Sequence, residues 1–216
     1  YCGPLNTRQK EYTRDMKEAG TRLLDLINDI LDLSTLEAGY MVLEREHIKI
    51  HDMMSSVYDL VNEWARKEKI EMALTCPKNI GGIHADGRRL QQALINIIRN
   101  AITFTPSGGN ITLSAARRKD AIEISVADTG IGISEEDRLR IFEPFERAQA
   151  GLKKSRQLHG GAGLGLSLVK SIVTLHGGTV ALESTPGKGT TVTMILPLTS
   201  EKTDLLLPLA EEKIGS

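Results

Sequence analysis

Apolar residues recur at spacings of three and four through the first forty residues of the chain. The residues of this stripe are Met16, Ala19, Leu23, Leu26, Ile30 and Leu33. The period predicts a helix from about Gln9 to Ala38, ended by Gly39, a residue type common just after helix C-termini. Neighbouring apolar residues broaden this face, which fits either a helix packed on its own domain or one arm of a helical hairpin that dimerises into a bundle. We expect the hairpin, because nothing N-terminal in this chain covers the face.

From Met41 onward, helical and strand-like patterns alternate. Strands are predicted over residues 47–52, 70–76, 110–118, 121–128, 178–184 and 189–198. Helices are predicted over residues 53–66 and 87–104 and after the glycine-rich run 161–165. Asp86 is well placed to cap the second of these helices, and period-two strands on each side of short turns predict two antiparallel hairpins. The expected fold class is α+β, an α/β sandwich with a mixed sheet covered on one face by helices.

Charge and cysteine content limit which partners and which cellular compartment we expect. A net charge of −1 over 216 residues, with both signs spread along the chain, gives no electrostatic reason to expect nucleic acid or an anionic membrane as a partner. Cys2 and Cys76 are too few for a disulfide framework and lack metal-ligand spacing, which favours a reducing, cytoplasmic compartment. No apolar run approaches the roughly 20 residues that span a bilayer, so we expect no direct membrane contact here. The chain begins at Tyr1, and we expect missing upstream sequence, which can anchor the full-length protein to the inner membrane.

Two glycine-rich motifs carry candidate chemistry. In "DTGIGI", residues 128–133, a carboxylate ends a strand and Gly130 and Gly132 follow it, so the acid can accept hydrogen bonds from a planar ligand while the glycines let it approach. Asp and Gly after a strand also make ordinary turns. In "GGAGLGLSLV", residues 160–169, glycines precede a helix whose N-terminal N–H groups and positive dipole end suit a phosphate. This motif matches neither of the common phosphate-loop fingerprints.

A polar stripe lies on the helix predicted over residues 87–104. Asn96, Asn100 and Thr103 are spaced i, i+4 and i+7 and therefore share one face. Such a stripe is commonly a solvated surface. Alternatively, an amide oxygen there helps to hold Mg²⁺, which takes oxygen ligands and often binds through substrate phosphates.

The order of these motifs resembles a known family. The asparagine helix, "DTGIG", "FEPF", "GAGLGL" and "GKGT" are similar to the five sequence boxes of the ATP-binding core of sensor histidine kinases, in the superfamily shared with gyrase, Hsp90 and MutL. "GPLNTRQKEY" and "LLDLINDILDLSTLEAG" resemble the loop and second helix of the dimerisation and phosphotransfer domain. Within the family the chain is most similar to the alphaproteobacterial cell-cycle kinases. The resemblance implies a partial helical hairpin at 1–40, an ATP-binding domain at 41–198 and a tail at 199–216.

The resemblance also implies a role for each matching residue. Asn100 would coordinate the Mg²⁺ that bridges the ATP phosphates, and Asn96 would line the same site. Asp128 would take the adenine amino group, beside Gly130 and Gly132. The residues implied for the remaining contacts are Thr190 on the adenine side, Arg147 at the terminal phosphate, and Gly161, Gly163, Leu164, Gly165 and Leu166 around the phosphates. Residues 148–161 would form a mobile lid, and the implied partners are a second copy of the chain and a response regulator.

Three features bear on activity. Where gyrase, Hsp90 and MutL carry a glutamate base four residues before the metal-binding asparagine, this chain has Asn96, which cannot take a proton near neutral pH. Where the family usually has Lys or Arg three residues after that asparagine, this chain has Thr103. No phosphoacceptor box of the HExxTP kind occurs, and we interpret each histidine as a surface or packing residue: His47, His51, His84, His159 and His176.

Two functions therefore stay open. The first is a kinase core that transfers the γ-phosphoryl of ATP to a residue on its own dimerisation domain and thence to a response regulator. The second is an ATP-binding scaffold that signals by conformation, as in the DivL-type members, where tyrosine replaces the acceptor histidine. Thr103 favours the scaffold, and the glycine boxes favour the kinase. An ATPase clamp is disfavoured by Asn96 and by the helical arm.

Overall fold

The computed structural model describes residues 3, 5–146 and 163–198 of the chain. The segment predicted to be a lid lies outside the described residues, as do Arg147, Gly161 and the predicted tail. The division into a hairpin, an ATP-binding domain and a tail stays a prediction.

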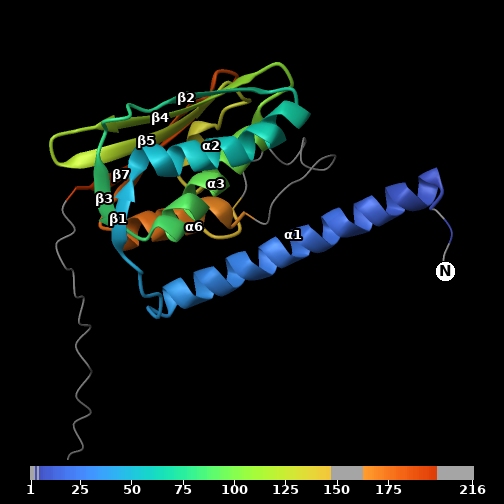
Figure 1. Cartoon of the computed structure of the whole chain (residues 1–216), viewed down its shortest axis with the longest axis horizontal. Helices are drawn as coiled ribbons and strands as arrows, with labels where there is room; N and C mark the ends of the chain where they lie inside the picture. Colours follow the sequence, from blue (N-terminus) through green and yellow to red (C-terminus); the bar gives the residue numbers. More distant parts are fainter. Residues whose placement is uncertain (1–2, 4, 147–162, 199–216) are drawn as a thin grey trace, which may run out of the picture.

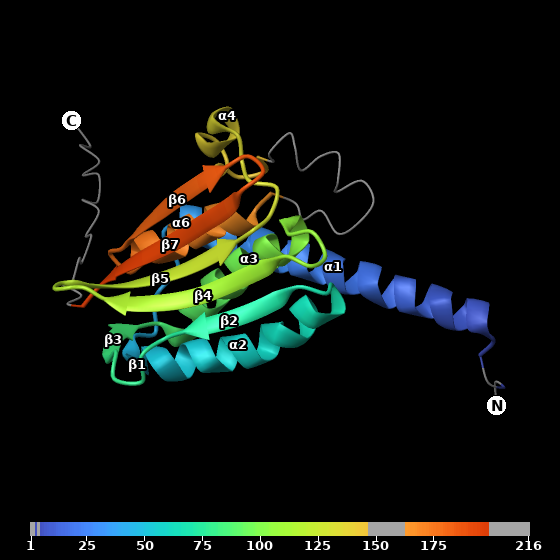
Figure 2. The ribbon, with the colours of Figure 1, turned by 90° about the horizontal axis from the view of Figure 1, so that it is seen from above.

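A five-stranded mixed sheet forms the centre of the fold, in the order β2-β4-β5-β7-β6 (Figure 2). The strands are β2 (Glu71–Thr75), β4 (Asn110–Arg117), β5 (Ala121–Asp128), β6 (Thr179–Thr185) and β7 (Gly189–Pro197). β2 runs parallel to β4 and the other pairs are antiparallel. Along β4 and β5 every second residue is fully buried, as expected for a sheet with one covered face. Both predicted hairpins, β4–β5 and β6–β7, are present.

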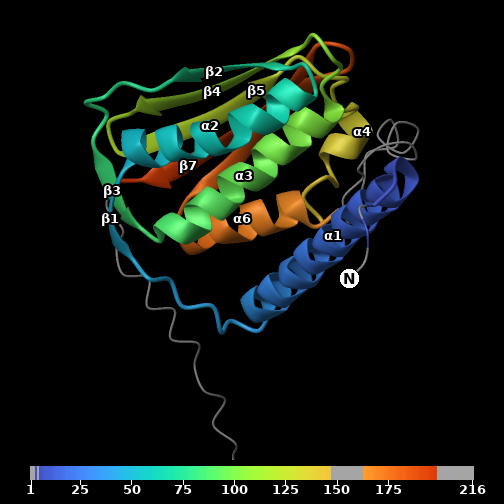
Figure 3. The same cartoon turned by 45° about the vertical axis from the view of Figure 1, so that its right-hand side comes forward.

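Three helices cover that face (Figures 1 and 3). They are α2 (Ile50–Lys67), α3 (Gly87–Phe104) and α6 (Gly165–Leu175). Their apolar sides pack with the buried sheet residues into one core, and α3 begins at the predicted cap, where the Asp86 side chain accepts a hydrogen bond from the Arg89 N–H. The expected α+β sandwich, with a mixed sheet and helices on one face, is confirmed.

The long helix α1 (Thr7–Glu37) precedes this sandwich and lies apart from most of it (Figures 1 and 3). A capping box formed by Asn6 and Gln9 starts the helix, and Gly39 follows its end with a φ of +71°. Only the last turns pack on the sandwich, where Leu33 is buried. The exposed apolar residues of α1 are Tyr12, Met16, Leu23, Leu24, Ile27, Ile30 and Leu31. One end of the helix thus packs on its own chain and the rest presents an uncovered face.

Polar contacts fix the end of α1 against α3. Asp32 accepts hydrogen bonds from the Arg89 guanidinium at 2.9 Å and from the Gln92 amide at 2.7 Å. Arg89 also donates to Gln92 Oε1, so the three side chains form one connected, half-buried network. Such a network holds the helix in one register, since each member has its partner.

The structure differs from the predicted elements at three places: one boundary changes and two short elements are added. The strand predicted over 47–52 is shorter: β1 comprises Glu46–Lys49, and α2 already begins at Ile50. Ile50 is fully buried and starts the helical i, i+3, i+4 pattern with Met53 and Met54, so helical packing outweighs the strand-like alternation. The short strand β3 (Gly82–Ala85), which pairs only with β1, and the one-turn helix α4 (Glu135–Arg138) were not predicted.

Candidate functional site

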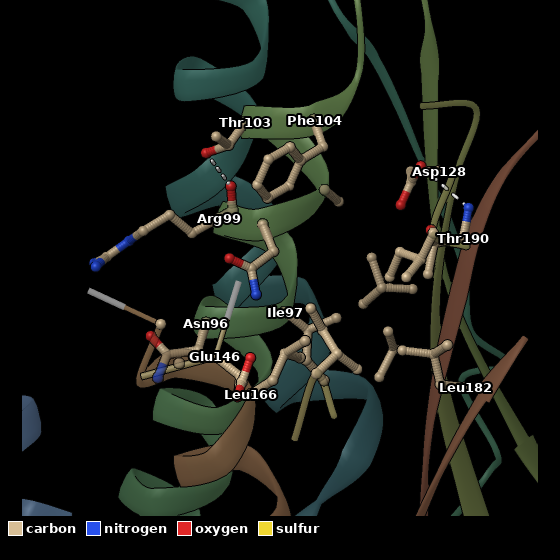
Figure 4. A pocket seen from close by; sticks show the side chains of 18 of the residues that line it. Asn96, Ile97, Arg99, Thr103, Phe104, Asp128, Glu146, Leu166, Leu182 and Thr190 are labelled. Carbon is tan, nitrogen blue, oxygen red and sulfur yellow. Dashed lines mark hydrogen bonds between the residues drawn. The ribbon is translucent and has the colours of Figure 1, made fainter. Parts of the chain in front are cut away.

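A pocket lies between α3, the ends of β5 and β7, and the start of α6 (Figure 4). The predicted site residues that line it are Asn96, Asn100, Asp128, Gly132, Gly163, Leu164, Gly165, Leu166 and Thr190. Gly130 lies beside it and donates its N–H to Asp128. The fold thus brings together residues from four separated sequence motifs, and the two predicted site residues missing from this set, Arg147 and Gly161, lie outside the described residues.

Asp128 forms one end of the pocket. Its Oδ1 accepts the Gly130 N–H at 2.7 Å and the Thr190 N–H at 3.2 Å. Burial raises the pKa of the Asp128 carboxyl, and these two hydrogen bonds oppose that rise. With Oδ1 held by two backbone donors, Oδ2 is the oxygen that remains to accept a hydrogen bond from a bound molecule.

The glycines after Asp128 are required by space and by backbone conformation. A Cβ on Gly130 would lie 2.6 Å from the Phe104 carbonyl oxygen. Gly132 has a φ of +69°, and a Cβ there would collide with the Thr185 carbonyl. Side chains at these positions would displace the loop from α3 and from the β6–β7 turn. The two glycines therefore allow the loop to pack closely against both elements beside the pocket.

The opposite end of the pocket is suited to an anion. Asn96 is 7% exposed, and its Nδ2 atom is buried without a hydrogen-bond partner. The start of α6 faces it: a Cβ on Gly165 would lie 3.9 Å from both Asn96 and the Asn100 Nδ2. The N-cap residue of α6 is Leu164, which makes no side-chain capping hydrogen bond. An unpaired amide donor thus faces an uncapped helix N-terminus, and both favour a negatively charged group.

A divalent metal would have few protein ligands here. The described residues contain no cluster of three or more His, Cys, Asp or Glu side chains that could hold a metal ion. Asn100 is half-buried and lines the pocket beside the start of α6. Its amide oxygen suits Mg²⁺, which commonly takes one or two protein ligands and completes its shell with waters and phosphate oxygens.

Sequence reasoning missed three charged residues that line the pocket. Asp29 comes from α1, whereas Arg99 and Glu146 come from α3 and from the segment after α4. The position of Arg99, three residues after Asn96, was a usable signal, because i and i+3 residues of a helix are neighbours. Asp29 carried no signal, since only the docking of α1 brings it to the pocket.

Thr103 also lines the pocket. Its hydroxyl donates to the Arg99 carbonyl oxygen at 2.8 Å, one turn back along α3 (Figure 4). The side chain thus bonds to its own helix and brings no positive charge to the pocket.

His176 is a packing residue, as predicted. It is buried, and its Nε2 accepts the Asp86 N–H at 3.0 Å, which leaves Nδ1 to donate to the Ile172 carbonyl at 2.8 Å. Burial lowers the pKa of this imidazole. His47 and His84 lie opposite each other on the separate two-stranded sheet β1–β3, and His159 lies outside the described residues.

Comparison with protein families matches both parts of the chain. Residues 85–200 match the model described as "Histidine kinase-, DNA gyrase B-, and HSP90-like ATPase". Residues 3–39 match the "His Kinase A (phospho-acceptor) domain". The chain belongs to the histidine kinase family. The two matched models are those of the ATPase and phosphoacceptor parts of histidine kinases.

Two curated relatives come from Caulobacter vibrioides. It is 42% identical over 201 residues to the "Non-motile and phage-resistance protein" of Caulobacter vibrioides, covering 91% of this chain and 23% of the relative. It is 38% identical to the "Sensor protein DivL" of the same organism, covering 91% of this chain and 24% of the relative. The chain thus spans about a quarter of the length of these two relatives. No helix of the described residues is long and apolar enough to cross a membrane.

Solved structures agree with the fold. Full-length ShkA in complex with AMPPNP superposes with a TM-score of 0.77 at 31% identity, covering 92% of this chain and 41% of that one. The histidine kinase ThkA in complex with the response regulator protein TrrA superposes with a TM-score of 0.70 at 27% identity, covering 93% and 54%.

Proposed function

We propose that this chain is the ATP-binding core of a cytoplasmic sensor kinase that transfers the γ-phosphoryl of ATP to a residue on its dimerisation domain, for relay to a response regulator. The observation that carries the proposal is the polarity of the pocket. A carboxylate held by two backbone N–H groups lies at one end, and an unpaired buried amide beside an uncapped helix lies at the other. A nucleotide with a purine amine and a phosphate chain matches both ends.

The residues of the pocket fit a nucleotide with Mg²⁺. Asp128 Oδ2 would accept a hydrogen bond from the adenine amine, Asn96 would donate to a phosphate oxygen, and Asn100 would hold the metal through its amide oxygen. When bound, Mg²⁺ neutralises phosphate charge and orients the phosphate chain. The start of α6, including Gly165, would supply backbone N–H groups to the phosphates. The solved ShkA structure contains a nucleotide analogue, which supports a nucleotide in this fold.

Phosphoryl transfer to a side chain fits this pocket better than hydrolysis. Asn96 occupies the position at which the ATPases of the superfamily carry a glutamate, and an amide cannot act as a general base. Its unpaired amide nitrogen is a donor suited to a phosphate oxygen rather than to an attacking water. A nucleophile from another domain makes a base at this position unnecessary.

We propose a dimer and a response regulator as partners. The apolar residues along α1 are exposed although the helix is ordered from Thr7 to Glu37, which is the arrangement that a helical bundle would bury. The ThkA structure, in which a related kinase is bound to a response regulator, supports the second partner.

Thr103 favours a second candidate function, an ATP-binding scaffold that binds a response regulator and signals by conformation. The Thr103 hydroxyl bonds to the Arg99 carbonyl, so this position supplies no cation to stabilise phosphoryl transfer. The relationship to the sensor protein DivL supports this candidate as well. Nucleotide binding is common to both functions, and only transfer separates them.

The test is Mg²⁺-dependent binding of ATP by calorimetry, with Asn100→Ala as the variant. We expect Asn100→Ala to weaken Mg·ATP binding by about ten- to a hundred-fold, the loss of one ligand to a charged group. Asn62→Ala, on α2 and away from the pocket, is the matched control and should bind like the wild type. No binding by the wild type would contradict both functions. Autophosphorylation of the natural longer protein then decides between them, since binding without phosphoryl transfer supports the scaffold.

A further inference from the structure

The charges that line the pocket are unfavourable for a polyphosphate. Among the described residues, Asp29, Asp128 and Glu146 bring three carboxylates to the pocket, and Arg99 is the one Lys or Arg that lines it. A nucleotide triphosphate adds several more negative charges. Among the pocket residues that the structure describes, Thr103 supplies no positive charge and Arg99 does.

Arg99 lies at that end. Figure 4 shows it on the same side of the pocket as Asn96, across from Asp128 and Thr190. It follows Asn96 by one turn of α3 and precedes Thr103 by one turn, or about 6 Å along the axis. Asn96 in turn faces the start of α6. Arg99 is therefore one helical turn from the position of the family's usual cation, on the same stripe of α3.

The other arginines of α3 are placed differently. Arg89 is held by Asp32 at 2.9 Å and bonds to Gln92 as well. Arg88 lines the neighbouring cavity between α1 and α3 but not this pocket. The Arg99 side chain is exposed and borders both this pocket and the neighbouring cavity.

We propose that Arg99 binds the phosphate groups of the nucleotide and replaces the cation that is missing at Thr103. The proposal rests on the proposed function, because it names a further binding residue of the same site. A guanidinium presents a planar fork of donors that matches phosphate oxygens and stays charged at all physiological pH values. Asp29 of α1 lines the same pocket, so its carboxylate and the phosphate groups would both attract the Arg99 guanidinium.

The test compares two ligands on the 216-residue chain. Mg·AMPPNP carries the phosphates and is titrated by calorimetry, whereas adenosine lacks them and is titrated by chemical-shift changes so that weak binding is measured. We expect Arg99→Gln to weaken Mg·AMPPNP binding by about ten-fold or more, the loss of a charge-assisted hydrogen bond, and to leave adenosine binding unchanged. Arg88→Gln removes the same charge from the same helix and should change neither affinity.

A double variant that restores the positive charge provides a second test. Adding Thr103→Lys to Arg99→Gln restores a cation to the same stripe, and we expect it to recover most of the lost Mg·AMPPNP affinity. Equal affinities for wild type and Arg99→Gln, or an equal loss for Mg·AMPPNP and adenosine, would overturn the proposal while leaving the proposed function intact. If the wild type bound neither ligand, the proposed function would fail with it.

Discussion

Asp128→Asn is expected to reverse the purine preference of the pocket. In the wild type, Oδ1 accepts the Gly130 and Thr190 N–H groups, and Oδ2 offers an acceptor to the ligand. An asparagine has a single oxygen, and the two backbone donors require it at the Oδ1 position. The Nδ2 group must then occupy the place of Oδ2 and point a donor into the pocket. Adenine would place its 6-amino group there, so two hydrogen-bond donors would face each other. The 6-oxo group of hypoxanthine would instead accept a hydrogen bond from the new amide.

The size of the effect follows from these contacts. Loss of the hydrogen bond to a charged carboxylate costs about 1.5–3 kcal/mol, and a buried donor left unpaired costs about 1–3 kcal/mol more. Together they predict a loss of about 2.5–6 kcal/mol for Mg·ATP, which is a rise in Kd of about 70-fold or more. For Mg·ITP the new hydrogen bond contributes about 0.5–1.5 kcal/mol. Stability should change little, because the amide keeps both backbone hydrogen bonds and removes a carboxylate whose pKa burial raises.

Competition between Mg·ATP and Mg·ITP, with thermal unfolding of each variant, tests this reasoning. Asp120→Asn, at the exposed β4–β5 turn, is the matched control and should keep the wild-type preference for ATP. The reasoning is refuted if Asp128→Asn still prefers ATP, or if it weakens both nucleotides equally. In either case the Asp128 carboxylate would not be the group that recognises the purine base.

Two further predictions concern stability. Burial lowers the pKa of His176 below the ordinary 6.5, with Arg45 adding to this effect and Asp86 opposing it, so the unfolded chain takes up a proton at a higher pH than the folded one. The stability that depends on neutral His176 should be complete above about pH 6.5 and fall as the pH drops toward the lowered pKa, by up to about 1.4 kcal/mol per pH unit. Urea unfolding at several pH values checks this, and an unchanged slope in His176→Gln would contradict it. Gly132→Ala should lower the free energy of unfolding by at least about 2 kcal/mol more than Gly108→Ala does. Both glycines have a positive φ, but of the two only Gly132 faces a backbone carbonyl, that of Thr185. Equal falls in melting temperature for the two variants would contradict this prediction.

Elements with a strong local signal could be predicted from the amino-acid sequence alone. The period of α3 and its Asp86 cap are local, and the structure reproduces both. The two hairpins and the single covered face of the sheet follow from period-two alternation. The order of the glycine and asparagine motifs indicated the family, and the family comparisons confirm it.

Tertiary structure decided what depends on distant neighbours. Polar and apolar residues alternate over 47–51 as in a strand, yet packing of Ile50 into the core makes residues 50–52 helical. Asn96 looks like one more polar surface residue until the start of α6 buries it and leaves its amide unpaired. Asp29 reaches the pocket only through the docking of α1. Local periodicity reports which way a side chain faces on its own element, whereas burial, pairing and charge balance depend on elements that lie far away in the sequence.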